Sequence, residues 1–477
     1  MSGGDLSLAE LLATSAATAP AASSANDREA AGRAAEGERA VRARRYGIAA
    51  DHFQQALALQ PEHRGARRGL ALALVGEGKM EAAWPVWRQA LTEAPDGIDW
   101  AQSEIERAMR GSEFELLGRL GRLLAQHRWG SRWFPGGEDT PVARVPRDVV
   151  SVAKLRHDAG QFAYLRREGI LAPEFDEVIR TYEQLAERMA ERDGQEARIP
   201  LDGDAQRLIG RVYNRIVHLA DTPRAAAALS SAWSPREVEA QFIEQRTGLV
   251  VIDDFLTPEA LDGVRRFAMQ STVWSGIRYA YGRLGAFFHD GFNCPLLLQI
   301  AEELKAALPN VITDAYPLRQ VWGFKNSTDL PADCNLHADF AAVNVNFWLT
   351  PEDCNLDPET GGMMVYDVDA PRAWDFHTYN GRTDIIKAFL RENRARQTYV
   401  PYRQNRCVIF NSDLFHGTHR VHFRPGFENH RINVTMLYGQ REDDTHHRSL
   451  TGRSDLAARW GTQRSAWSSH VFARHRS

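Results

Sequence analysis

Two histidines, an aspartate and an arginine are the residues of this chain whose types and order could do chemistry. His337 and Asp339 lie two positions apart, and His416 follows far downstream. In an extended backbone, residues i and i+2 project to the same face, so His337 and Asp339 can reach one metal ion. Two imidazoles and one carboxylate can hold one face of a ferrous ion and leave the other open. Arg431 could grip a carboxylate of a molecule bound at that open face.

The segment that begins at Arg431 alternates polar and apolar residues. A β-strand would place its polar members Arg431, Asn433 and Thr435 on one face. The guanidinium and a second donor from Asn433 or Thr435 could then receive one carboxylate together. Asn344 and Asn346 alternate with apolar residues after the metal pair, so they either face the cavity or are satisfied asparagines of a sheet. We count Asn346 among the cofactor-binding residues.

The third metal ligand has rivals nearby in the sequence. His419 and His422 both lie close to His416. We favour His416 because it follows the apolar strand predicted at residues 406–410, whereas the other two lie within the next predicted strand at 419–423.

Two further groups invite attention near this region. His289 and Asp290 look like metal ligands, but adjacent residues on a strand point in opposite directions, so we reject this pair as a site. Trp322 and Phe324 lie on a predicted strand before the metal motif, and we expect them in the core rather than in a pocket.

The bulk composition excludes several classes of protein. A chain of 477 residues with 43% apolar and 25% charged residues is typical of a globular protein of two or three domains. A net charge of -4 gives no sign of a surface that binds nucleic acid. No apolar run reaches the length of a membrane span, and the start lacks the basic-then-apolar order of a signal peptide. The four cysteines have no CxxC spacing. We therefore expect a cytoplasmic protein that binds neither nucleic acid nor membrane.

An internal repeat marks the N-terminal region. Residues 1–26 are rich in alanine and serine and are predicted to be disordered. Five residues then recur after thirty-four positions: Ala49, Phe53, Ala56, Leu57 and Pro61 return as Ala83, Trp87, Ala90, Leu91 and Pro95. This period, with small residues where helices would cross, resembles the tetratricopeptide repeat. We predict helical repeats over residues 27–129; an unrelated pair of helical hairpins is the alternative.

The middle of the chain connects this region to one of different character. Residues 130–150 contain several prolines and glycines and are predicted to be a linker. Apolar residues at helical spacing from Val152 to about Arg192 predict a helical bridge, which we extend over residues 151–240. The adjacent His157 and Asp158 are expected on the solvated face of this helix.

Short strands dominate the C-terminal region. A strand at 249–256 leads into Thr257 and Pro258, a good helix start, and helices are expected at 260–270 and 296–308. Further strands are predicted at 319–325, 341–349, 362–368, 406–410, 419–423 and 431–438. Together they predict a sandwich or jelly roll over residues 241–445, followed by a tail at 446–477.

The predicted fold class is therefore α+β multidomain: N-terminal helical repeats followed by a C-terminal jelly roll. A segment at 371–401, with its own helix at 383–394, interrupts the predicted β domain. Long segments inserted into a compact domain are commonly lids or binding loops. We interpret this one as an element that covers substrate, with packing filler as the alternative.

The segment from Gly248 to about Gln440 resembles the iron(II)- and 2-oxoglutarate-dependent oxygenases, whose core is a double-stranded β-helix of jelly-roll type. The resemblance rests on the order of His337, Asp339, His416 and Arg431. The sequences Val-Val-Ile-Asp-Asp-Phe-Leu-Thr-Pro-Glu at 250–259 and Asn-His-Arg-Ile-Asn-Val-Thr-Met-Leu-Tyr-Gly at 429–439 are also typical of that family.

The resemblance implies a set of roles for these residues. His337, Asp339 and His416 would hold iron and form the catalytic centre, and Arg431 would clamp 2-oxoglutarate. Dioxygen would be the second cosubstrate, and ascorbate a stimulant. Halogenating members of the family replace the carboxylate ligand by a small residue, so the presence of Asp339 favours hydroxylation or a related C–H oxidation.

Three functions are consistent with these patterns. The leading hypothesis is a hydroxylase that acts on a peptide or protein recruited by the helical repeats, because concave helical arrays commonly bind polypeptide. The second keeps the chemistry but takes a small metabolite, with the repeats forming a homodimer. The third is a catalytically silent scaffold in which the repeats carry the function.

Overall fold

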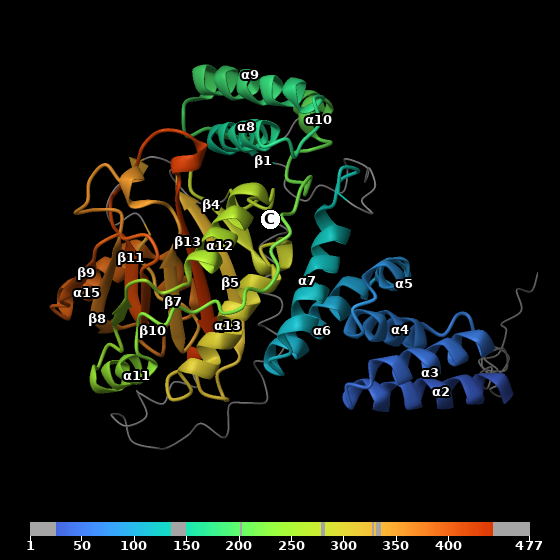
Figure 1. Ribbon diagram of the computed structural model, residues 1–477. Coiled ribbons are helices and arrows are strands. Elements are labelled where there is room, and N and C mark those ends of the chain that lie inside the picture. The colour runs from blue at the N-terminus through green and yellow to red at the C-terminus, as the bar shows by residue number, and fades with distance from the viewer. Residues whose placement is uncertain are drawn as a thin grey trace, which may run out of the picture. The chain divides into compact units, whose positions relative to one another are not determined.

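The computed structural model describes residues 25–134, 149–200, 203–277, 282–326, 329–330 and 335–441. Most of the predicted disordered N-terminus, the middle of the predicted linker and the predicted tail lie outside these residues. The chain forms two compact units, Met1–Asp99 and Trp100–Ser477, which are drawn together in Figure 1. The predicted order, a helical region followed by a domain rich in antiparallel sheet, is confirmed.

The first unit contains four described helices that lie wholly within it: α2 (Ala25–Arg42), α3 (Tyr46–Leu59), α4 (Arg64–Gly76) and α5 (Met80–Thr92). Phe53 in α3 and Trp87 in α5, two of the recurring residues, are buried. A Cβ atom at Gly37 of α2 would lie only 2.7 Å from the Phe53 ring, so glycine permits this close approach. The helices are confirmed, and the relation to tetratricopeptide repeats stays a resemblance.

Helix α6 (Gly97–Arg110) begins at the division between the units, and α7 (Phe114–Trp129) lies in the second unit. The C-terminal end of α7 is fixed to the 3-10 turn η2 (Phe288–Asp290), because Trp129 Nε1 donates a hydrogen bond to Asp290 Oδ1 at 2.9 Å. Gly121 of α7 lies against Phe288 and Asn293, so this helix packs tightly on the β-rich region.

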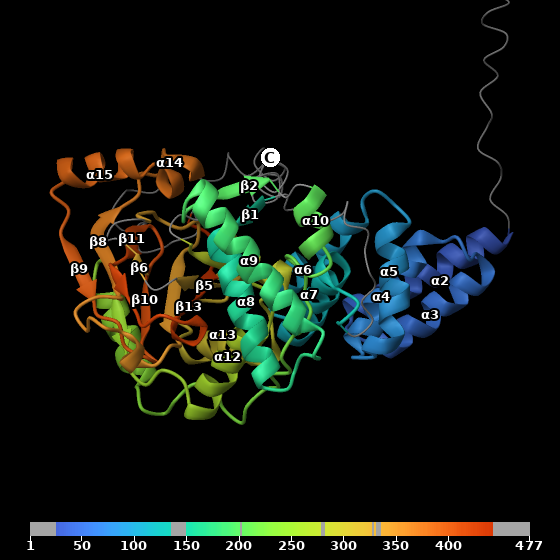
Figure 2. The same ribbon diagram turned by 90° about the horizontal axis from the view of Figure 1, so that it is seen from above.

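Two antiparallel helices follow as predicted, α8 (Val152–Arg167) and α9 (Phe175–Asp193). They share an apolar core that includes Leu155, Phe162 and Tyr182. A short strand pair, β1 (Val149–Ser151) with β2 (Arg198–Pro200), joins their outer ends, and α10 (Gly203–Ile209) follows. In Figure 1 α8 and α9 run side by side at the top of the unit, and in Figure 2 they lie in front of its sheets.

The expectation of a solvated face for His157 and Asp158 is wrong. Their exposed fractions are 2% and 3%, because this side of α8 packs against a strand of the main sheet. There the Lys325 Nζ lies 3.3 Å from His157 Nε2. Lys154, one helical turn before Asp158, forms an ion pair with its carboxylate, so the buried charges partly compensate one another.

Two antiparallel sheets form the rest of the second unit. The larger has the order β3-β10-β7-β13-β5-β4, and its strands are β3 (Val250–Ile252), β4 (Leu284–Phe287), β5 (Leu318–Asn326), β7 (Val343–Trp348), β10 (Cys407–Asn411) and β13 (Arg431–Tyr438). The smaller has the order β11-β8-β9, with β8 (Met363–Asp369), β9 (Gln397–Val400) and β11 (Leu414–Thr418). A minor pair joins β6 (Asp329–Leu330) to β12 (Val421–His422).

The two sheets face each other across one apolar core. Trp348, Val408 and Phe410 from the larger sheet pack with Val365 and Val400 from the smaller. The other face of the larger sheet is covered by α12 (Pro258–Gln270) and α13 (Pro295–Ala307), as Figure 1 shows. The Tyr438 hydroxyl of β13 donates a hydrogen bond to the Ala301 carbonyl of α13 at 3.2 Å.

The remaining elements surround the sheets. α11 (Pro235–Glu244) precedes β3, and α14 (Phe376–Gly381) with α15 (Thr383–Glu392) forms the helical part of the predicted insertion. The 3-10 turns η3 (Glu352–Cys354) and η4 (Phe427–Asn429) shape two connections. In the described part of the chain no helix has the length and apolar character needed to cross a membrane.

Candidate metal centre

His337, Asp339 and His416 are held together by backbone hydrogen bonds. The His337 amide donates to the His416 carbonyl at 3.0 Å, and the His416 amide donates to the His337 carbonyl at 2.8 Å. The Asp339 amide donates to the Ser412 carbonyl at 3.2 Å. The extended segment before β7 is thereby fixed to β11, and the three side chains converge between the two sheets.

The potential ligand atoms of these three residues all lie within 4.8 Å of one another. His337 Nε2 is 3.6 Å from Asp339 Oδ1, and His416 Nε2 is 3.4 Å from Asp339 Oδ2. Among the described residues, these three form the group of histidine, cysteine and acidic side chains that could share a metal ion. His419 and His422 do not belong to this group. The geometry therefore brings together the three residues that the sequence singled out.

The location of His416 differs from our expectation. We placed it at the end of the apolar strand predicted at 406–410, but it lies within β11, a separate strand that the sequence analysis missed. The stated reason for preferring it to His419 was therefore wrong. What distinguishes His416 is its pairing with His337 across the two backbones.

Backbone carbonyls orient both imidazoles. His337 Nδ1 lies 2.8 Å from the Asn335 carbonyl oxygen, and His416 Nδ1 lies 2.9 Å from the Leu414 carbonyl oxygen. A carbonyl oxygen only accepts hydrogen bonds, so each Nδ1 carries the proton and each Nε2 presents a lone pair. This is the usual arrangement of histidines that bind metal.

The protonation states suit a divalent cation. Burial, and secondarily the neighbouring His416, lowers the pKa of His337 to about 4. For Asp339, burial would raise the pKa, but the two histidines and the Asn344 amide outweigh it and lower the pKa. Near neutral pH the site therefore offers a neutral His337 imidazole and an ionised carboxylate.

Polar side chains connect Asp339 to the neighbouring strand. Asn344 Nδ2 donates to Asp339 Oδ2 at 2.7 Å, and Asn346 donates to the Asn344 side-chain oxygen. Thr435 Oγ1 then donates to Asn346 Oδ1 at 2.5 Å. Thr435 lies opposite Asn346 in the register of β13 with β7, so the sheet itself aligns these groups.

The same hydrogen-bonded series continues to the arginine. Asn433 Nδ2 donates to Thr435 Oγ1 at 3.3 Å, and Arg431 donates to Asn433 Oδ1 at 3.2 Å. Arg431 is only 1% exposed; its Nε donates to the Gly361 carbonyl and its guanidinium lies 5.4 Å from the centre of the Trp348 ring. The arginine is thus held in one orientation from β13.

A cavity of about 490 Å³ joins the metal group to this arginine. Its lining includes the three potential metal ligands and four residues predicted to bind a cofactor: Arg431, Asn433, Thr435 and Asn346. Asn344 is absent from the described lining and instead positions Asp339. Trp322 and Phe324, which we expected in the core, also line the cavity, because the alternation of β5 turns both toward it.

The insertion forms part of the cavity wall. Phe376, His377 and Asn380 from α14 line it, as does Thr383 at the start of α15. Asn380 Nδ2 donates to the carbonyl of Ala338, the residue between His337 and Asp339, at 2.8 Å. This segment is therefore tied to the metal motif, as a covering element would be.

Sequence reasoning missed two arginines of the cavity and placed His289 and Asp290 on a strand, whereas they lie in the turn η2. Arg128 comes from α7 and Arg283 from the residue before β4, and both line the cavity. His289 and Asp290 line it too, although they do not belong to the group that could hold an ion. Adjacent residues can both reach the cavity because they lie in the turn η2 and not on a strand.

Comparisons with known proteins give partial likenesses. No protein-family model matches the sequence, and no curated protein matches it. A prolyl-4-hydroxylase structure from Pseudomonas putida shares 14% identity over 46% of this chain and 99% of its own, with a TM-score of 0.26. The non-heme α-ketoglutarate-dependent carbocyclase SnoK of nogalamycin biosynthesis shares 12% identity over 48% of this chain and 96% of its own, with a TM-score of 0.32. HygX from Streptomyces hygroscopicus, solved with nickel and 2-oxoglutarate, shares 16% identity over 43% of this chain and 87% of its own, with a TM-score of 0.30.

Proposed function

We propose that this chain is a non-haem iron(II)- and 2-oxoglutarate-dependent oxygenase that hydroxylates a C–H bond. One observation carries the proposal: three potential ligand atoms within 4.8 Å of one another share a cavity with a buried arginine. The two groups are joined by hydrogen-bonded side chains on adjacent strands.

The donor set fits a ferrous ion. Two imidazole nitrogens and one carboxylate oxygen are the ligands of a facial iron site, and the cavity leaves its other side open. The backbone carbonyls on His337 and His416 fix the tautomer that such a site needs. The amide of Asn344 donates a hydrogen bond to the Asp339 carboxylate and orients it.

Bound iron, 2-oxoglutarate and dioxygen together would supply the oxidant for C–H hydroxylation, with 2-oxoglutarate converted to succinate and carbon dioxide. The residues of the chain bind and orient. Arg431 receives the far carboxylate of 2-oxoglutarate as a two-pronged partner, and Asn433 and Thr435 set the plane of its guanidinium. Phe376 and Asn380 of the insertion line the cavity, and a substrate bound against them would displace water from it.

The substrate is either a group on a peptide recruited by the helical repeats or a free metabolite. The repeats support the first proposal, because helical arrays commonly bind polypeptide. A cavity of about 490 Å³ lies in the usual range of about 300–1,000 Å³ for small-molecule sites, which supports the second. Both keep the same chemistry at the metal.

Anaerobic equilibrium dialysis against ferrous iron tests the site. We expect one ion per chain in the natural protein and its loss in His337→Ala. His422→Ala is the matched control, because His422 was a rival ligand and lies outside the group. Loss of iron from His422→Ala with retention in His337→Ala would refute the assignment.

Succinate release separates the enzyme from a silent scaffold. The enzyme should convert 2-oxoglutarate to succinate, and faster when a peptide or metabolite pool contains its substrate. Stimulation by peptides alone supports recruitment by the repeats, and stimulation by metabolites alone supports the small-molecule alternative. Iron binding without succinate from any pool would favour the scaffold.

A further inference from the structure

The cavity that holds the proposed metal centre carries an excess of positive side chains. Its described lining contains three arginines and two carboxylates: Arg128, Arg283, Arg431, Asp290 and Asp339. A ferrous ion and the 2-oxoglutarate dianion would add equal and opposite charges, so the excess persists in the loaded site. A low-dielectric cavity with this balance attracts an anionic guest.

The three arginines lie in different surroundings within the cavity. Arg128 lies 3.5 Å from the Asp290 carboxylate, and Arg431 belongs to the proposed cosubstrate clamp. Arg283 supplies the third positive charge, with an exposed fraction of 6%. Arg283 and the metal group line the same cavity.

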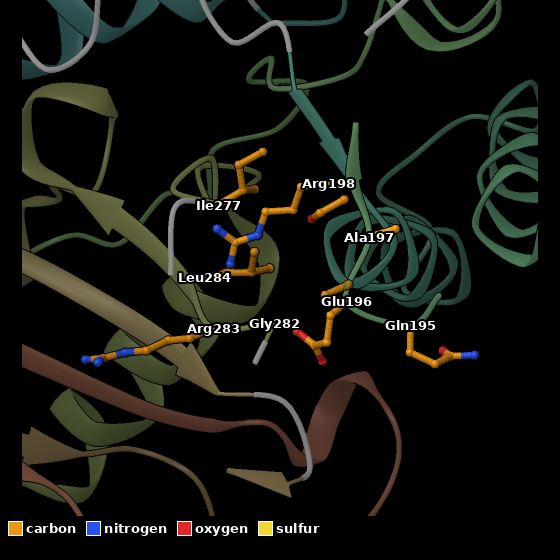
Figure 3. A pocket seen from close by; sticks show the side chains of 10 residues that line it. Gln195, Glu196, Ala197, Arg198, Ile277, Gly282, Arg283 and Leu284 are labelled. Atoms are coloured by element: carbon orange, nitrogen blue, oxygen red, sulfur yellow. The ribbon is translucent and has the colours of Figure 1, made fainter. Parts of the chain in front are cut away.

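An aromatic contact holds the Arg283 guanidinium. Its Cζ atom lies 3.9 Å from the centre of the Phe324 ring in the neighbouring strand β5. Figure 3 shows the Arg283 side chain extending away from Glu196 and Arg198 and towards the sheet. A guanidinium held against an aromatic ring can also bind a carboxylate or phosphate by two hydrogen bonds.

The wall beside Arg283 is a continuous series of aromatic rings. Ring centres are separated by 6.3 Å for Phe287 and Phe324, and by 6.2 Å for Phe324 and Trp322. The series continues from Trp322 to Phe340 and from Phe340 to Phe376, with 6.4 Å at each step. All five rings line the cavity, so an apolar body attached to the anion would be covered from β5 to the insertion.

We propose that Arg283 and these aromatic rings form the substrate subsite, and that the substrate is a small anion, a carboxylate or a phosphate ester, joined to an apolar body. The inference rests on the proposed function, because it takes the metal group as the place of reaction. The aromatic wall and the arginine would orient the apolar body across the open side of that group.

Binding of matched charged and neutral probes tests the subsite. The probes are 3-phenylpropanoate against 3-phenylpropanamide, and 2-phenylethyl phosphate against 2-phenylethanol. Isothermal titration calorimetry is run on the full chain, both metal-free and loaded anaerobically with iron and 2-oxoglutarate. We expect at least one anion to bind about tenfold or more tightly than its neutral partner. The preferred pair distinguishes a carboxylate from a phosphate substrate.

Substitution of the arginine assigns the preference. Arg283→Gln should weaken the preferred anion by about 10- to 100-fold and leave the neutral probe unchanged, whereas Arg283→Lys should keep part of the preference. Arg224→Gln is the control, since Arg224 is an exposed arginine paired with Glu302 outside the cavity. If Arg283→Gln does not fold, the probe pairs on the natural protein and on Arg283→Lys decide.

Several results would overturn the subsite. These are equal binding of charged and neutral probes, binding of no anion, or an anion preference that Arg283→Gln retains. Loss of 2-oxoglutarate binding in Arg283→Gln would make Arg283 a cosubstrate residue instead, and this also contradicts the inference. Failure of the natural protein to bind 2-oxoglutarate contradicts the proposed function alone, because the metal-free titrations still measure the anion preference.

Discussion

Asn344 is the side chain that most directly holds the carboxylate of the metal group, through its hydrogen bond to Asp339 at 2.7 Å. Removing such a partner typically weakens metal binding by about 10- to 100-fold. We therefore expect Asn344→Ala to lower ferrous affinity by this factor in anaerobic dialysis, with little change for the exposed Asn393→Ala. Unchanged affinity in Asn344→Ala would mean that Asp339 is oriented by the backbone alone.

A second prediction at the residue scale concerns Arg431. A two-pronged charged hydrogen bond contributes enough that its loss should weaken 2-oxoglutarate binding by about 10- to 100-fold. We expect this for Arg431→Gln, a smaller loss for Arg431→Lys, and none for the exposed Arg420→Gln. Ferrous binding should stay unchanged in all three, measured by the same dialysis. Equal 2-oxoglutarate affinity in Arg431→Gln would exclude the arginine as the clamp.

Some of the site residues were predictable and others were not. His337 with Asp339, and Arg431 with Asn433 and Thr435, could be found because residues two apart share a face of an extended backbone. The two arginines missed by sequence reasoning reach the cavity from elements far away in the chain. No local pattern indicates such convergence, since it is produced by packing of α7 on the β-rich region and by pairing of β4 with β5 in the larger sheet.

At the scale of elements, the sequence predicted five of the six strands of the larger sheet, while β4, β9 and β11 of the two main sheets were not predicted. The residues of β11, Leu-Phe-His-Gly-Thr, do not alternate polar and apolar side chains and include a glycine, so they show no strand pattern. Burial of His157 and Asp158 in α8 was missed because the residues that pack against them lie far away in the sequence. The lysine beside His157 comes from β5, more than 150 residues later in the chain.

This buried contact between α8 and β5 makes folding sensitive to acid. His430, whose ring centre lies 6.0 Å from that of His157, belongs to the same buried cluster. Burial, with the nearby Lys325, lowers the pKa of His430 to about 3, and burial likewise lowers the pKa of His157. Both histidines stay neutral in the folded protein but gain protons near pH 6.5 when unfolded. Their contribution to the free energy of unfolding is therefore fully present above pH 6.5 and is lost as the pH falls towards 3.

We expect the free energy of unfolding of the metal-free protein to fall by about 2 kcal/mol or more between pH 7 and pH 4.5, measured by urea titration. His430→Phe, which keeps the ring but cannot titrate, should show a shallower dependence. If the free energy of unfolding of the variant depended on pH as steeply as that of the natural protein, His430 would not be the cause of the acid sensitivity.

At the scale of the whole molecule, the metal group and the arginine belong entirely to the second compact unit. It stays a proposal that this unit performs the chemistry and that the helical repeats recruit a substrate. It requires first that the second unit bind iron and 2-oxoglutarate at the positions assigned.

The most direct measurement of that requirement is the visible spectrum of the ferrous protein on addition of 2-oxoglutarate without oxygen. We predict a weak charge-transfer band in the natural protein. The band should be absent in His337→Ala, and in Arg431→Gln it should need a much higher 2-oxoglutarate concentration. No band in the natural protein, or an unchanged band in His337→Ala, would contradict the account.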